Sequence, residues 1–418
     1  MARLLLLLPS ATYRAADFLA AARALGAEVV VASERRLVSM DDDTQLTLDL
    51  RRPEAAAEAI AGLAASRRLD AVVAVDEQGV RVAALAAERL GLSGNPPDAV
   101  AATRDKAAMR HALAAAGVPQ PEHRTVGPSD DSAAVAAEVG LPCVVKPLAL
   151  SASRGVIRAD DPRAAAAAAA RVRAILAEAG EDPDGPLLIE HYVPGAEVAV
   201  EGLLRAGSLE PLAVFDKPDP LEGPYFEETI FTTPSRLPGE IVEAVTRTTA
   251  DACAALRLRE GPVHAELRVN DGQVWMLELA ARSIGGLCSR SLRFGAGVSL
   301  EEVILRHALG LPLGDLRREA PASGVMMLPI RRAGLLREVR GQDEARAVSG
   351  IAGLEISIGR DRPVRPLPEG DRYLGFLFAR GETPAQVEHA LRAAHGRLEI
   401  AIGEPAAGEP SGAAPAQG

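Results

Sequence analysis

Short apolar runs alternate with helical segments over the first 97 residues, and this alternation limits the fold more than any other feature of the chain. Apolar strands are expected at 4–8, 28–32 and 70–75, with helices at 12–25 and 79–90. Strands that alternate with helices pack as a parallel sheet. The first strand is not followed by Gly-x-Gly-x-x-Gly, so a dinucleotide fingerprint is absent. We therefore expect an α/β domain over residues 1–97.

The pattern changes after residue 97. A helix is expected at 103–116, and a second at 163–179. Short strands are expected at 143–146, 187–190, 197–204, 262–269 and 273–279, which indicates an α+β domain over residues 98–310. Two further strands (324–329 and 373–379) and a helix (384–395) predict a C-terminal α+β block over 311–403. The tail, 404–418, is rich in Pro, Ala and Gly and is expected to be disordered.

Charge and cysteine content exclude several classes of protein. Lys and Arg number 46 and Asp and Glu 57, so the net charge is −11, and the arginines form no basic stripe. This pattern argues against a nucleic-acid-binding protein. Three widely spaced cysteines fit a reducing cytoplasm better than a disulfide framework. The five leucines near the start are too few for a signal sequence or a membrane span.

Two glutamates lie on neighbouring predicted strands, Glu266 in 262–269 and Glu278 in 273–279, with Asn-Asp-Gly between the strands. A two-residue loop would put Glu266 and Glu278 on opposite faces, whereas an odd-length loop puts them on the same face. Two carboxylates so close need a cation between them, and Mg²⁺ takes carboxylate and phosphate oxygens. We therefore predict an odd-length loop and a shared Mg²⁺ site. The alternative is that each carboxylate faces water separately.

Two lysines and a small-residue loop predict contacts to phosphates. Lys106 begins a predicted helix, and Lys146 closes an apolar strand, where a buried ammonium group needs an anion. The loop that follows contains Ser151, Ser153 and Gly155, residue types whose backbone and hydroxyl groups can close over phosphates. Taken singly, either lysine could instead reach water, and the loop could be an ordinary turn.

Three further groups of residues complete the candidate site. Backbone near Val193, between Glu190 and Glu197, could meet an adenine edge, and Glu197 could accept bonds from ribose hydroxyls. Arg282 begins a glycine-rich loop and could clamp a phosphoryl group. The candidates for holding an amino substrate are Glu227, Glu228 and His264. Adjacent glutamates often only face solvent, and the histidine could be packed against the sheet.

The order of the candidate residues along the chain resembles the ATP-grasp superfamily over about residues 100–310. This order is the two lysines with the loop that contains Ser151, Ser153 and Gly155, which we call the serine loop, then the glutamates, and then Arg282. The run Glu278-Leu-Ala-Ala-Arg282 and the stretch 215–229 are similar to its L-amino-acid ligase branch. Many members carry Asn two residues after the second metal glutamate, whereas this chain has Ala280. The resemblance therefore leaves the number of bound metal ions open.

The resemblance implies an ATP-dependent ligase that joins a carboxylate to an amine through an acyl phosphate and releases ADP and phosphate. It implies phosphate contacts from Lys106, Lys146 and the loop with Ser151, Ser153 and Gly155. It assigns Glu190 and Val193 to adenine, Glu197 to ribose, Glu266 and Glu278 to Mg²⁺ or Mn²⁺, and Arg282 to the acyl phosphate. The substrates would be small and amino-acid-like, and relatives are often homodimers. Alternatives are biotin-carboxylase-like or purine-pathway chemistry, or a nucleotide-binding module without catalysis.

Overall fold

The computed structural model describes residues 2–36, 44–319 and 321–404. The N-terminal part is a parallel sheet in the order β3 (Gln45–Thr47), β2 (Glu28–Ser33), β1 (Arg3–Leu7), β4 (Ala71–Ala74). Alternate leucines of β1 pack against α1 (Ala15–Ala24) on one face and against α2 (Pro53–Ser66) and α3 (Val80–Leu90) on the other. Both faces are therefore covered, as the unbroken run of leucines requires. The expected parallel-sheet domain is confirmed.

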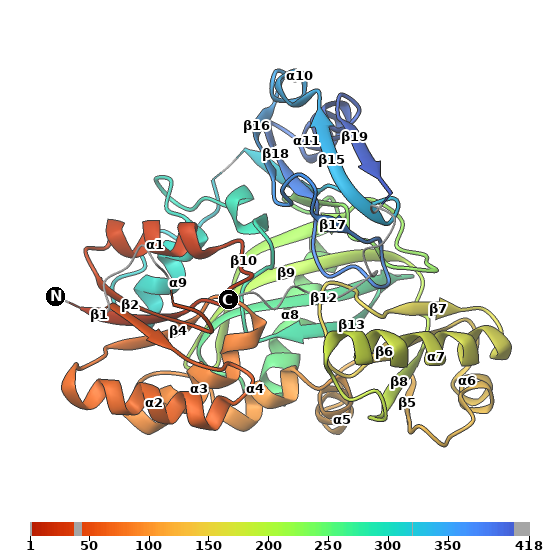
Figure 1. The fold of residues 1–418 in the computed structure, drawn as a ribbon, viewed down its shortest axis with the longest axis horizontal. Helices are drawn as coiled ribbons and strands as arrows, with labels where there is room; N and C mark the ends of the chain where they lie inside the picture. Colours follow the sequence, from red (N-terminus) through yellow and green to blue (C-terminus); the bar gives the residue numbers. More distant parts are fainter. Residues whose placement is uncertain (1, 37–43, 320, 405–418) are drawn as a thin grey trace.

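A smaller antiparallel sheet has the order β5 (His123–Val126), β8 (Leu187–His191), β6 (Cys143–Pro147), β7 (Ile157–Ala159). Helices α6 (Ser132–Val139) and α7 (Pro162–Ala179) pack on it (Figure 1). The many alanines of α7 let the helix lie close to the sheet. We call this unit the small sheet. It carries Lys146, Glu190 and the serine loop.

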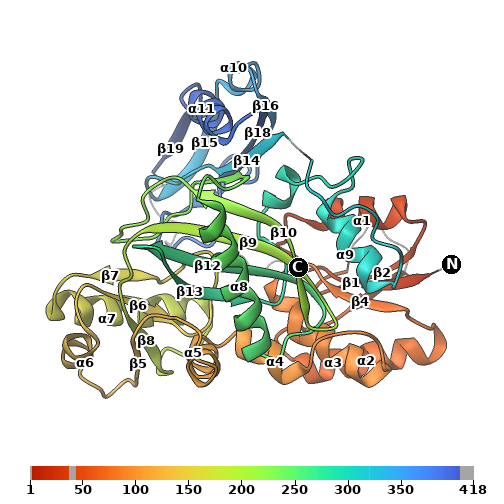
Figure 2. The same cartoon turned by 180° about the vertical axis from the view of Figure 1, so that it is seen from behind.

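The largest sheet contains eight antiparallel strands. Their order is β13 (Gln273–Ala280), β12 (Gly261–Asn270), β9 (Ala196–Arg205), β10 (Ser208–Lys217), β11 (Ile230–Thr233), β14 (Ala322–Met327), β18 (Gly375–Gly381) and β16 (Ile351–Ile356). Helix α8 (Gly239–Ala255) crosses one face (Figure 2). The last three strands come from the C-terminal block, so this block continues the central sheet.

The rest of the C-terminal block is a three-stranded sheet of β17 (Pro363–Val364), β15 (Gly334–Arg340) and β19 (Glu399–Gly403) with α10 (Gln342–Arg346) and α11 (Pro384–His395). The expected α+β character is confirmed. The expected tail lies outside the described residues apart from Glu404, which follows β19. Among the helices that the structure describes, none combines the length and apolar character needed to cross a bilayer.

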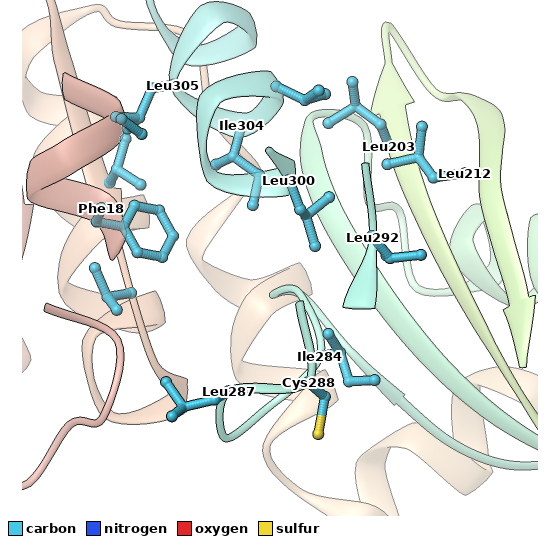
Figure 3. Packing of buried hydrophobic residues seen from close by; sticks show 14 of the residues in the cluster. Phe18, Leu203, Leu212, Ile284, Leu287, Cys288, Leu292, Leu300, Ile304 and Leu305 are labelled. Atoms are coloured by element: carbon cyan, nitrogen blue, oxygen red, sulfur yellow. The ribbon is translucent and has the colours of Figure 1, made fainter. Parts of the chain in front are cut away.

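One hydrophobic core joins the N-terminal domain to the eight-stranded sheet. Phe18 of α1 packs with residues of α9 (Leu300–Ala308) and with Leu203 and Leu212 of β9 and β10 (Figure 3). Ile284 and Cys288, from the loop after β13, are part of the same core. This packing fixes the loop that begins at Arg282 against two domains.

The helix expected at 103–116 is wrong at its start. Helix α4 (Pro97–Thr103) ends there, and a separate helix α5 (Lys106–Ala115) follows. The side chain of Asp105 accepts hydrogen bonds from the backbone N–H groups of Ala107 and Ala108, at 2.9 and 3.1 Å. An aspartate cap of this kind defines a helix N-terminus. Lys106 is therefore the first residue of α5.

Candidate active site

The loop that joins β12 to β13 has two residues, so the predicted odd-length loop is wrong. Asp271 and Gly272 both have positive φ, 49° and 78°, as a tight hairpin turn requires. Glu266 is nevertheless the direct partner of Glu278, because a bulge shifts the register between Glu266 and Leu267. The bulge inserts one residue, Leu277, into β13. The predicted common face of the two glutamates is thus achieved by the bulge and not by the loop.

Three carboxylates, one buried and two half-buried, surround Lys217, the last residue of β10. Its Nζ lies 2.7 Å from Glu197 Oε1 and 3.4 Å from Glu266 Oε2, and it also pairs with Glu228. Burial acts to lower the pKa of Lys217, but the carboxylates raise it well above its ordinary value. Burial likewise acts to raise the pKa of Glu266, and Lys217 and His264 hold it well below the ordinary range. The cluster is therefore charged.

Lys217 was missed by the sequence reasoning, although the signal was present. Like Lys146, it closes an apolar strand whose last residues are buried. Its three partners come from different strands and loops, so their contacts with Lys217 could not be predicted from the sequence. The oxygens of Glu197, Glu228 and Glu266 lie within 4.8 Å of one another, close enough to share a metal ion.

Lys146 and Glu190 face each other on the small sheet. Glu190 pairs with Lys146 and accepts a hydrogen bond from Arg110 Nε at 2.6 Å. Burial acts to raise the pKa of Glu190, but Arg110 and Lys146 lower it to about 2. For Lys146, burial lowers the pKa and the Glu190 carboxylate acts against it. Both oxygens of Glu190 thus bind cations in this structure.

Arg110 links that pair to the bulge. Its two terminal nitrogens donate to the carbonyl oxygens of Met276 and Leu277, at 3.3 and 2.6 Å, and its side chain is fully buried. A bulge leaves backbone groups without strand partners, and the guanidinium satisfies two of them. Arg110 therefore joins the small sheet to the hairpin that carries Glu278.

Lys106 also contacts this hairpin. Its Nζ donates to the carbonyl oxygen of Leu150 at 3.1 Å and lies 3.3 Å from Glu278 Oε1. Leu150 begins the serine loop, in which Leu150, Ala152 and Ser153 have φ of 73°, 56° and 56°. Side-chain-bearing residues rarely adopt this left-handed conformation, so the loop is strained. Lys106 holds one end of the strained loop beside the glutamate pair.

At the other end of the site, Arg268 is bonded to three groups. It donates to Glu197 Oε2 at 2.9 Å, to the Val193 carbonyl at 2.7 Å and to the Leu221 carbonyl, and it stacks on Tyr192. Arg268 lies two residues after Glu266 on β12, so the two side chains share a face of the sheet. Here it fixes the carboxylate of Glu197 and the linker that contains Val193.

Arg282 is held by the N-terminal domain. Its Nε donates to Glu77 Oε2 at 2.9 Å, and Glu77 lies in the turn after β4. Burial acts to lower the pKa of Arg282, but Glu77 and other nearby carboxylates raise it. Glu77 is a further residue that the sequence analysis did not predict, because the contact spans 205 positions. Arg282 is thus a preorganised cation at the domain junction.

His264 bridges two glutamates. Its Nδ1 lies 3.2 Å from Glu201 Oε2 and its Nε2 lies 3.6 Å from Glu266 Oε1. Glu201 also accepts the Ile284 backbone N–H at 2.9 Å. Burial acts to lower the pKa of His264, while the two glutamates raise it above its ordinary value. The histidine therefore orients Glu266.

These groups line one cavity of about 330 Å³. Twelve of the fourteen predicted site residues border it: Lys106, Lys146, Ser151, Ser153, Glu190, Val193, Glu197, Glu228, His264, Glu266, Glu278 and Arg282. Glu227 borders a separate cavity of about 20 Å³ instead, and Gly155 packs on Pro147. Burial raises the pKa of Glu227. We call the cavity of about 330 Å³ the chamber.

Three known domain families match parts of this chain. Residues 19–94 match the ATP-grasp N-terminal domain, 139–291 the ATP-grasp domain and 326–403 the L-amino acid ligase C-terminal domain 2. The chain is 27% identical over 288 residues to alanine–anticapsin ligase of Bacillus subtilis, covering 64% of this chain and 60% of the relative. It is 31% identical over 241 residues to D-alanine–D-alanine ligase of Desulforudis audaxviator, covering 52% of this chain and 72% of the relative.

The crystal structure of an L-amino acid ligase from Bacillus licheniformis superposes with a TM-score of 0.81 at 23% identity. The match covers 97% of this chain and 99% of that one, so the two share a fold over nearly their whole lengths. The alignment with the Bacillus subtilis relative spans about six tenths of the relative's length.

Proposed function

Because the chain belongs to the ATP-grasp superfamily, in its L-amino acid ligase branch, we propose that it uses ATP to join the carboxylate of one amino-acid-like substrate to the amine of another. The observation that carries this proposal is the direct pairing of Glu266 with Glu278 in a chamber that also contains Lys106, Lys146 and Arg282. These groups match the charges of a metal-bound triphosphate and of a carboxylate that accepts a phosphoryl group.

The glutamate pair suits a divalent cation. Two carboxylates on one face repel each other, and the ammonium groups of Lys106 and Lys217 now offset that repulsion at 3.3 and 3.4 Å. Glu266 and Glu278 would hold Mg²⁺, which neutralises charge on the phosphate oxygens. His264, held by Glu201, would orient Glu266 toward it. Ala280, the direct partner of His264, offers no further ligand.

In the first step, a carboxylate oxygen of one substrate attacks the γ-phosphorus of ATP, the bond to the ADP oxygen breaks, and an acyl phosphate forms. Phosphoryl transfer of this kind depends mainly on positioning and charge stabilisation. Lys146 and Lys106 would bind the phosphates, and the serine loop would cover them. Arg282 would stabilise the acyl phosphate, because Glu77 already fixes its guanidinium.

In the second step, the amine of the other substrate attacks the acyl carbon, and phosphate leaves with the electrons of the carbon–oxygen bond. The attacking amine must be neutral. Glu228, which burial makes a weaker acid than usual and which borders the chamber, is placed to accept its proton. Its pairing with Lys217 would keep it in place.

An ADP-release screen with Mg²⁺ tests the function. Pairs of amino acids form the first arm, and bicarbonate and a phosphoribosylamine form the second and third, with mass spectrometry of every product. We expect ADP and an amide in equal amounts in the first arm. Release of ADP with bicarbonate or the phosphoribosylamine, and none with amino acids, would assign the chain to carboxylation or purine-pathway chemistry. Nucleotide binding without turnover in every arm would indicate a non-catalytic module.

A further inference from the structure

The loop between β17 and β18 crosses from the C-terminal block to the small sheet. We call residues 365–373 the strap. At one end it contacts α7 and the serine loop, and at the other Asp371, Arg372 and Tyr373 border the chamber. A single short segment therefore contacts both the covering loop and the chamber wall.

Two ion pairs fasten the strap to α7. Arg171 makes a two-point contact with Glu369, Nε to Oε1 at 2.7 Å and a terminal nitrogen to Oε2 at 3.1 Å. Arg365 pairs at 2.7 Å with Glu178, which lies about two turns after Arg171 on the same helix. Two-point arginine–carboxylate contacts fix orientation as well as distance. The strap is thus aligned along α7.

The strap also holds the serine loop directly. The backbone N–H of Gly155 donates to the Pro368 carbonyl at 2.9 Å. Ala152 and Ser153 face Gly370 and Arg372 across a cavity of only about 20 Å³. The left-handed residues of the loop keep their conformation only if surrounding groups over-determine it. Lys106 supplies one restraint at Leu150, and the strap supplies the other at Gly155.

The chamber end of the strap is fixed to the carboxylate cluster. The Tyr373 hydroxyl donates to Glu228 Oε2 at 3.3 Å, while Glu228 pairs with Lys217. The Tyr373 ring packs edge-on against Phe376 of β18. A hydrogen bond therefore links Glu228 to the residue that ends the strap.

We infer that the strap positions the serine loop over the phosphates of ATP, with Glu369 and the Pro368 carbonyl as positioning groups. Through the strap, the C-terminal block would connect the amino-acid end of the chamber to the loop that binds ATP. This inference rests on the proposed ligase function. None of these groups touches the reacting atoms. Loosening the strap should weaken ATP binding more than it slows the chemical steps, and should let the chamber admit water to the acyl phosphate.

The test compares Glu369→Gln with the wild type. We expect KM for ATP to rise about three- to tenfold, with a smaller change in kcat, because a partly exposed ion pair is lost. The ratio of ADP released to amide formed should rise above one. Asp315→Asn, which breaks an exposed two-point contact with Arg317 away from the chamber lining, is the matched control and should change neither quantity.

A charge exchange separates positioning from folding. Glu178→Arg alone should act like Glu369→Gln, and Glu178→Arg with Arg365→Glu should restore KM and the product ratio. In an active wild type, unchanged KM and unchanged ratio in the Glu369 and Glu178 variants would overturn the inference. If the wild type forms no amide, the proposed function fails, and calorimetric affinity for a non-hydrolysable ATP analogue then decides the strap. Equal affinity of the wild type and Glu369→Gln for the ATP analogue would contradict the positioning role of the strap.

Discussion

Lys217 Nζ lies 2.7 Å from Glu197 and 3.4 Å from Glu266, so one ammonium group serves the carboxylate expected at the ribose and the one expected at the metal. The lysine side chain is 3% exposed, which leaves little water to screen these charges. The nucleotide end and the metal end of the chamber thus share a counter-ion.

Lys217→Met should destabilise the protein strongly, because one buried and two half-buried carboxylates lose their common cation. A broken buried pair costs about 3–5 kcal/mol. Urea unfolding followed by circular dichroism measures the change. Lys217→Arg, which keeps the charge, is the control and should lose less. Millimolar Mg²⁺ should recover part of the loss in Lys217→Met, since a divalent ion can take the place of the ammonium. A variant as stable as wild type would contradict this account.

Lys146→Met should lower ADP release about 100- to 1000-fold, the loss expected when one preorganised donor to a transferring group is removed. Glu278→Ala should have a similar effect through the metal site. Stopped-flow or coupled-enzyme measurement of ADP gives the rate, and circular dichroism checks the fold. Near-normal ADP release by either variant would remove that residue from the mechanism.

Arg110→Met should combine two defects. Glu190 would lose its hydrogen-bonded partner, and the carbonyls of Met276 and Leu277 would be left buried without donors. We expect a loss of about 3–5 kcal/mol in unfolding free energy, together with weaker nucleotide binding by calorimetry. Arg110→Lys keeps the charge but lacks the forked donors, so it should be intermediate. If Arg110→Lys matched the wild type, the two bulge carbonyls would not need the guanidinium.

Glu190 should contribute to acid sensitivity. Its folded-state pKa of about 2 lies below its ordinary value of 4.5, so the stabilisation it provides is complete above about pH 4.5 and is lost as pH falls toward 2. The difference in unfolding free energy between wild type and Glu190→Gln should therefore shrink over this window. Glu58→Gln, on an exposed position of α2, is the control. A difference that stayed constant from pH 5 to pH 3 would oppose the assignment.

Much of the fold followed from local pattern. The leucine run of β1 predicts a strand because a strand that is buried on both faces is continuously apolar. The alternation of apolar and polar residues in β12 predicts a strand because neighbouring side chains point to opposite faces. Twelve residues chosen for phosphate, metal or substrate chemistry border one chamber, and their individual roles stay predictions. The aspartate that splits the helix at Lys106 was readable too, as an N-cap.

Register and long-range partners could not be read in this way. The bulge at Leu277 depends on Arg110, which lies 167 positions away, so no local rule places it. Glu227 and Glu228 are neighbours in sequence, yet only Glu228 turns toward Lys217. Glu77 meets Arg282 only because two domains pack together. Each miss concerns a contact that the folded sheets create.

The unbroken run of strands from β13 to β16 makes the C-terminal block a continuation of the sheet that carries Glu266 and Glu278. A shortened chain that ended before β14 would leave β11 as a bare edge, with a row of unpaired amides and carbonyls open to pairing with another chain. Swapping C-terminal blocks between relatives would therefore exchange strands of the sheet together with any effect on substrate selectivity. Insolubility would be the first sign that the exchanged strands pair poorly with β11.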